Sequence, residues 1–268
     1  MFENATKVIS DAMSAQTTDG YKIFWEILRL RNSYLIYLDN KIALSNELIH
    51  FEEYFSSLST SEKNTRRRQR AISKNIFNMI ASAQALKEHL RIKCEKLCSP
   101  PSNKNSFYLF RELRNYIIHQ ASFPLISKRS GKIVKNERIL IVTHHFDMPR
   151  MLDFISNKKD NPNISQKQKK QLEDLVEFIR DLPEDLSFTK MIQDFDREVI
   201  DFYKRWVISY VKLNRKNLLE LEETALQIHS TPIDEKESKI INLPINIYQR
   251  RWLKILLKSK YFINQGIL

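Results

Sequence analysis

One short run of the chain carries side chains that could cleave a phosphodiester. Arg114 is followed at once by Asn115, and His119 comes four residues later, within a stretch whose apolar spacing predicts a helix. The arginine is a permanent cation, and the imidazole can exchange a proton near neutral pH. These groups could stabilise a charged phosphorane and move the protons that RNA cleavage requires, without a metal.

The spacing of an arginine and a histidine is weak evidence when it stands alone. Arg138 also precedes His144 and His145 by a similar distance, but these residues lie in a stretch that predicts a strand. The run at Arg114 has a helical context, because apolar residues recur at helical spacing and predict a core-facing stripe: Phe110, Leu113 and Ile117.

The predicted helix puts two of the three polar residues on one face. Asn115 and His119 lie one turn apart, and the long side chain of Arg114 can swing toward them. Pro124 limits the helix, which we expect over about 103–121, so His119 falls near its C-terminus, where unpaired carbonyls favour a cation. The alternative is that Arg114 and His119 are ordinary solvated helix residues.

The run from Phe110 to Gln120 resembles the signature of the HEPN superfamily, in which four to six residues lie between an arginine, often followed by a polar residue, and a histidine. The resemblance is close over about 107–121 and architectural elsewhere. It implies a small helical bundle, a metal-independent RNase without a cofactor, and a homodimer that pools two arginines and two histidines. It also implies a toxin or anti-phage role, with an antitoxin or regulatory partner.

One position departs from the toxin members of that superfamily. Some of them carry a tyrosine two residues after the histidine, whereas this chain has Ala121 there. Modification of such a tyrosine by a paired nucleotidyltransferase is therefore not expected. The hairpin and the tail predicted below also exceed a minimal HEPN domain, which leaves the subfamily open.

Composition favours a mainly helical fold and a partner with phosphates. Three glycines in 268 residues are too few for tight-turned sandwiches, barrels or glycine-rich phosphate loops. The formal net charge of +12 suits a polyanion such as RNA, since neutralising phosphates releases counterions. An AT-rich genome, which enriches lysine, asparagine and isoleucine in all its proteins, is the alternative origin of this charge.

Two basic segments are candidate nucleic-acid contacts. A helix expected from about Ser61 to Leu97 opens with a dense cluster, for which a solvated face is the alternative: Arg66, Arg67, Arg68 and Arg70. A β-hairpin is expected at about 124–146, around a turn at Ser130 and Gly131. Its cations could form a rim for an RNA strand beside the motif helix: Lys128, Arg129 and Lys132.

Other residues that could bind metals have simpler interpretations. Cys94 and Cys98 have no second pair to complete a zinc site, so we expect reduced thiols. The sequence His144-His145-Phe146-Asp147 provides two histidines and one carboxylate, and adjacent strand residues point to opposite faces. No metal is expected. The N-terminal stretch lacks the apolar core of a signal peptide and no apolar run could span a membrane, which predicts a cytoplasmic protein.

The predicted organisation is one helical domain with a tail. Residues 1–230 are expected to form the HEPN-like helical domain with its hairpin, and 231–268 an apolar, basic helical tail that docks on the bundle or on a partner. Residues 21–58 predict two helices with a kink, and 187–223 predict one long helix. The predicted function is an endoribonuclease. The alternative is a non-catalytic HEPN-like or other helical protein that binds nucleic acid or docks a partner.

Overall fold

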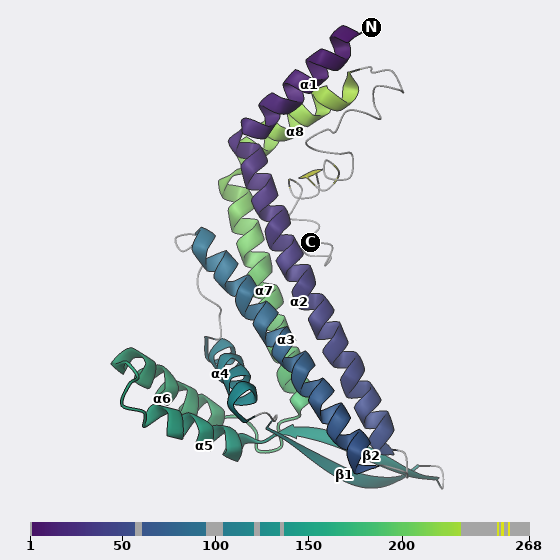
Figure 1. Ribbon diagram of the computed structural model, residues 1–268, viewed down its shortest axis with the longest axis vertical. Helices are drawn as coiled ribbons and strands as arrows, with labels where there is room; N and C mark the ends of the chain where they lie inside the picture. Colours follow the sequence, from purple (N-terminus) through teal and green to yellow (C-terminus); the bar gives the residue numbers. More distant parts are fainter. Residues whose placement is uncertain are drawn as a thin grey trace. The chain divides into compact units, whose positions relative to one another are not determined.

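The computed structural model describes residues 2–56, 61–94, 104–120, 124–134 and 137–231, together with residues 251, 253, 254 and 257. This part is mainly helical with one two-stranded antiparallel sheet, as composition predicts (Figure 1). In chain order the elements are α1 (Phe2–Thr17), α2 (Asp19–Ser56), α3 (Glu62–Cys94), α4 (Lys104–Gln120), β1 (Leu125–Val134), β2 (Glu137–Phe146), α5 (Met148–Lys159), α6 (Gln166–Arg180), α7 (Phe188–Leu213) and α8 (Arg215–Ser230).

The chain divides into two compact units. One comprises Met1–Asn32, His89–Cys98 and Tyr203–Leu268, and the other Ser33–Glu88 and Ser99–Phe202. Helices α2, α3 and α7 contribute residues to both units. The tail predicted over 231–268 lies outside the described residues except for positions 231, 251, 253, 254 and 257. Within the described residues, no helix is both long and apolar enough to cross a bilayer.

In the first unit, α1 packs against α8 and α2 approaches α8 closely. Val8, Ala12 and Ala15 of α1 form a buried cluster with Ile228 of α8. A Cβ atom at Gly20 would lie 2.3 Å from the carbonyl oxygen of Asn217, so glycine permits this approach of two backbones.

The second unit has an aromatic core between α4 and α7. The ring of Phe110 stacks on Phe195 with centroids 3.8 Å apart, and Phe107 meets the same ring edge-on at 5.2 Å. A buried polar contact lies between α2 and α7, where Asp196 accepts hydrogen bonds from Tyr37 Oη at 3.0 Å and from Lys41 Nζ at 2.5 Å. Burial raises the pKa of Tyr37, and the nearby Asp196 charge raises it further.

The hairpin is present, but its turn is not where the sequence predicts it. The ladder pairs Leu125 with Phe146 at one end and Val134 with Glu137 at the other. Gly131 therefore lies within β1, and the expected turn at Ser130 and Gly131 is wrong. The β-branched residues beyond the glycine extend the ladder, and the connecting residues 135 and 136 lie outside the described part.

Two helix predictions also need correction. Residues 19–56 form one helix, α2, where two helices with a kink were expected. The helix predicted over 187–223 ends in the structure at Leu213, and α8 starts at Arg215. Asn214 separates them, and its side chain donates a hydrogen bond to the carbonyl oxygen of Tyr210 at 2.9 Å. Asparagine competes with helical hydrogen bonding in this way.

Candidate functional site

A groove of about 640 Å³ lies between α4 and α5 in the second unit. The motif helix provides four of its lining residues, and α5 with the residues after it provides the others: Asn115, Tyr116, His119, Gln120, Arg150, Asp153, Phe154, Asn157, Lys158 and Asn161. Two cations and one carboxylate therefore line the groove beside an exposed imidazole. Its size and charge suit part of a nucleotide strand.

Core packing decides which residues of α4 face this groove. Phe110 and Leu113 are buried, as the helical stripe predicts, while Ile117 is only half-buried. On the α5 side, Tyr116 meets Phe154 edge-on with centroids 5.2 Å apart. The ring of His119 lies 6.4 Å from the same phenyl ring, so the histidine sits at the margin of an apolar contact.

The start of α5 is fixed by an N-terminal cap at Asp147. The side chain of Asp147 accepts a hydrogen bond from the backbone nitrogen of Arg150 at 3.3 Å, and Pro149 occupies an early helical position. Arg150 Nε also pairs with the Asp147 carboxylate at 3.1 Å. One capping residue therefore sets the start of α5 and restrains a cation of the groove.

The buried carboxylate of Glu112 holds two of the groove's lining residues, Asn115 and Lys158, by hydrogen bonds. Glu112 is only 1% exposed, and its oxygens accept hydrogen bonds from Arg111 Nε at 3.1 Å, from Asn115 Nδ2 at 3.1 Å and from Lys158 Nζ. Charged groups this deeply buried require such partners. Because Nδ2 of Asn115 is used, its Oδ1 is the atom available to accept a hydrogen bond from His119 or from a ligand.

The structure brings together two of the three predicted catalytic residues. Asn115 and His119 both line the groove, and His119 is exposed without a hydrogen bond to any described residue. Arg114 is not among the lining residues. Its Cζ lies 5.1 Å from the ring centroid of Phe77 on α3, and its buried Nε has no partner among the described residues. The expected swing of Arg114 toward His119 is not what this chain adopts.

The sequence patterns did not indicate the two cations that line the groove with His119, Arg150 and Lys158. Lys158 lies on α5, and only the packing of α5 on α4 brings it to the groove. The available signal was Glu112, an acidic residue directly beside the apolar stripe of α4. A carboxylate that is buried in that place requires cationic partners, of which Arg111 is on the same helix and Lys158 on α5.

The predicted basic helix divides into residues with different partners. Arg66 pairs with Glu62 at 2.5 Å on the exposed surface. Arg68 pairs with Glu47 of α2 at 3.6 Å, whereas Arg67 and Arg70 are exposed. On the hairpin, Lys128 is exposed on β1; Arg129 and Lys132 also lie on β1, with side chains outside the described part.

The histidines at the end of the hairpin form hydrogen bonds. The two nitrogens of His145 lie 2.9 Å from the carbonyl oxygen of Asp185 and 2.9 Å from Thr143 Oγ1. Nδ1 of His144 lies 3.0 Å from Ser127 Oγ, and its ring lies 4.9 Å from Phe51. Burial and the neighbouring His145 lower the pKa of His144 to about 4.

The described residues contain no cluster of three histidine, cysteine, aspartate or glutamate side chains that could hold a metal ion. Of the two cysteines, Cys94 ends α3, and Cys98 lies outside the described part. Comparisons with protein-family models, with curated proteins and with solved structures find no match for this chain.

Proposed function

We propose that this protein is a HEPN-type endoribonuclease that cleaves RNA without a metal ion in the groove between α4 and α5. The observation that carries the proposal is that Asn115 and His119 line one groove together with the cations Arg150 and Lys158. An exposed imidazole beside two cations is suited to bind a phosphodiester and to exchange a proton with it.

The reaction uses the nucleophile that RNA itself supplies. The 2′-oxygen attacks the adjacent phosphorus, the new O2′–P bond forms, and the P–O5′ bond breaks. His119 accepts the proton of the 2′-hydroxyl or donates one to the leaving 5′-oxygen. The products are a 2′,3′-cyclic phosphate and a 5′-hydroxyl. DNA lacks the nucleophile and resists cleavage.

The remaining polar groups have separate roles in this proposal. Lys158 and Arg150 offset the charge that develops on the phosphorane oxygens, and Asn115 orients the imidazole or binds a phosphate oxygen. We assign Arg114 to supporting α4 against α3, because its guanidinium would have to leave Phe77 to reach the phosphate. Glu112 positions both Asn115 and Lys158.

A homodimer is part of the proposal. One chain supplies one motif histidine, whereas concerted acid and base catalysis requires two proton-transferring groups. Two copies related by a two-fold axis through their motif helices would supply both. A role as a toxin or in anti-phage defence, under an antitoxin or another regulatory partner in the cytoplasm, follows from the family resemblance.

The second candidate function is RNA binding without cleavage, by a HEPN-like scaffold or another helical protein. One observation favours it: Arg114, the motif cation, lies on Phe77 and does not line the groove. Such a protein would bind RNA through its basic surfaces and release it intact.

The test is incubation of the purified full chain with end-labelled RNA and matching DNA in EDTA. We expect RNA fragments that end in a cyclic phosphate, identified by mass spectrometry, and intact DNA. A single 2′-deoxynucleotide in the RNA should block cleavage at its own linkage. Strict dependence on a divalent ion would contradict the mechanism, and RNA that is bound but never cut would favour the second candidate.

A further inference from the structure

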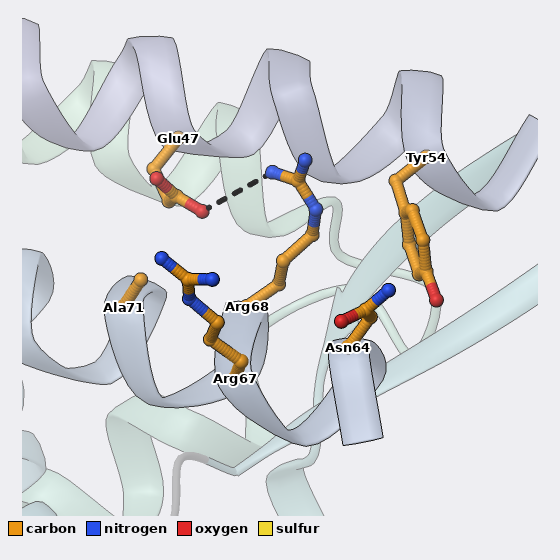
Figure 2. A pocket seen from close by; sticks show the side chains of 6 residues that line it. All are labelled: Glu47, Tyr54, Asn64, Arg67, Arg68 and Ala71. Atoms are coloured by element: carbon orange, nitrogen blue, oxygen red, sulfur yellow. Dashed lines mark ion pairs between the residues drawn. The ribbon is translucent and has the colours of Figure 1, made fainter. Parts of the chain in front are cut away.

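A second groove lies between α2 and α3, away from the motif residues in sequence. It has a volume of about 430 Å³, and Figure 2 shows its lining residues: Glu47, Tyr54, Asn64, Arg67, Arg68 and Ala71. The two arginines reach from α3 toward α2 into the same space. None of the lining residues belongs to the groove at His119.

One wall of this groove is held in place by several contacts. Arg68 pairs with Glu47 at 3.6 Å and lies over the ring of Tyr54, with Cζ 5.2 Å from the centroid. The Tyr54 hydroxyl donates to the carbonyl oxygen of Ser61 at 3.0 Å and accepts from its backbone nitrogen at 2.8 Å. The side chains of this wall are therefore already ordered before a ligand binds, and binding costs them less conformational entropy.

The second arginine is available to a ligand. Arg67 is exposed and pairs with no carboxylate among the described residues, whereas its neighbours Arg66 and Arg68 are both paired. The groove thus holds two guanidinium groups against the single carboxylate of Glu47, and Asn64 adds a polar side chain. The excess positive charge and the planar donor fork of arginine suit a phosphate group.

We propose that the groove between α2 and α3 is a second contact site for single-stranded nucleic acid, in which Arg67 binds a phosphodiester while Arg68 and Tyr54 form the wall. This inference deepens the proposed function and rests on RNA being the ligand. Within the basic cluster of α3, Arg67 and Arg68 line the groove, whereas Arg66 and Arg70 do not.

The position of the site on α3 implies a dependence on strand length. Ten residues of α3 separate Arg67 from Phe77, the residue that contacts α4 through Arg114, which corresponds to about 15 Å along the helix. A strand that occupies both grooves has to be long enough to span the distance between them, so short strands can engage only one. Engagement of two linked sites then raises affinity beyond that of either alone.

The test compares Arg67→Gln with Arg70→Gln in the full chain. Both substitutions remove one exposed arginine from the same helix, but only Arg67 lines the groove. The probe is fluorescent single-stranded DNA of about 16 nucleotides, which carries the same phosphodiester and lacks the 2′-hydroxyl. Binding is measured by anisotropy over a range of salt concentrations, and thermal melting verifies that both variants fold.

We expect Arg67→Gln to weaken binding about fivefold at about 0.1 M salt and to reduce the salt slope by about 0.7, the values for one lost single-strand phosphate contact. Arg70→Gln should lose clearly less, and a strand of about 4 nucleotides should show a smaller difference between the variants. Equal losses in the two variants would overturn the inference and indicate a general charge effect.

Cleavage of RNA by the wild-type chain in EDTA is scored separately. Cleavage together with equal losses in the two variants would refute the second site and leave the nuclease standing. A selective loss for Arg67→Gln without any cleavage would support the site and refute the nuclease. The two proposals can therefore fail independently.

Discussion

Lys158 of α5 donates a hydrogen bond to Glu112 of α4, a carboxylate that is almost completely shielded from solvent. The same carboxylate oxygen accepts the amide of Asn115 at 3.1 Å. Two residues that line the groove are therefore tied to one buried anion, which also links the two helices. A substitution of Glu112 should therefore lower the stability of the fold and also change the positions of Asn115 and Lys158 in the groove.

Glu112→Gln should destabilise the protein by about 1–3 kcal/mol, because it leaves Lys158 and Arg111 without the negative charge that they share. Urea unfolding followed by circular dichroism measures the loss. Glu62→Gln is the matched control, since Glu62 forms an exposed pair with Arg66 and should contribute little. Equal effects from both substitutions would show that Glu112 has no special structural role.

His119→Ala should reduce RNA cleavage by about 10²–10⁴-fold and leave the melting temperature unchanged, since an exposed side chain is removed and acid–base catalysis is lost. RNA affinity should change little, because a single imidazole adds little to a chain with a net charge of +12. His50→Ala, also exposed but outside the groove, should retain activity. Full activity of His119→Ala would exclude the nuclease mechanism.

The purified chain should be a homodimer in solution, with a mass of twice 32.0 kDa by light scattering. Mixing wild-type and His119→Ala chains should lower the activity per wild-type subunit if each site uses groups from both copies. A monomer that cleaves RNA at full rate would contradict the pooled site.

Alkaline pH should destabilise the fold through Tyr34 and Tyr37. Burial raises the pKa of Tyr34 to about 12 and also raises that of Tyr37, with the Asp196 charge as the second cause. Between about pH 10 and 12 the unfolded chain thus binds fewer protons than the folded chain, and stability falls as pH rises. Tyr37→Phe should cost about 1–2 kcal/mol at neutral pH and make this alkaline loss less steep in urea titrations. An unchanged alkaline slope would show that the Tyr37 phenol does not contribute.

Acid should act on the contact between the hairpin and α2. The pKa of His144 is lowered to about 4 from 6.5, so the unfolded chain binds more protons in this range. Stability should therefore fall as pH drops from about 6.5 to 4, by about 3 kcal/mol at most. His144→Gln should flatten this dependence in urea titrations, and exposed His50→Gln should keep it. An identical slope for wild type and His144→Gln would refute the assignment.

Local patterns predicted much of the fold, because they are properties of short stretches. The motif helix expected over 103–121 is α4, Lys104–Gln120. The errors arise where a single residue had to be weighed against its neighbours. A glycine does not form a turn by itself, and the β-branched residues after Gly131 continue the ladder beyond it. Asn214 ends α7 within an otherwise helical pattern.

The site itself was only partly predictable. The shared face of Asn115 and His119 follows from helical periodicity, whereas the position of Arg114 depends on which neighbour its flexible side chain contacts. Phe77 and Lys158 lie on other helices, and no periodicity within α4 indicates that one faces Arg114 and the other approaches Glu112. Such contacts between helices depend on tertiary packing, and short-range sequence patterns do not indicate them.

The two-stranded hairpin has a consequence for colloidal behaviour. Among the described residues the sheet has two strands, and the outer side of β2 is paired at its end, where His145 forms a bridge with Ser187. The remaining outer backbone groups are a template on which a strand of another molecule could pair and start aggregation. Lysine and arginine at positions 128, 129 and 132 of β1 place like charges on such strands and oppose their association. The same cations that we expect to attract RNA would thus also keep copies of the hairpin apart at high concentration.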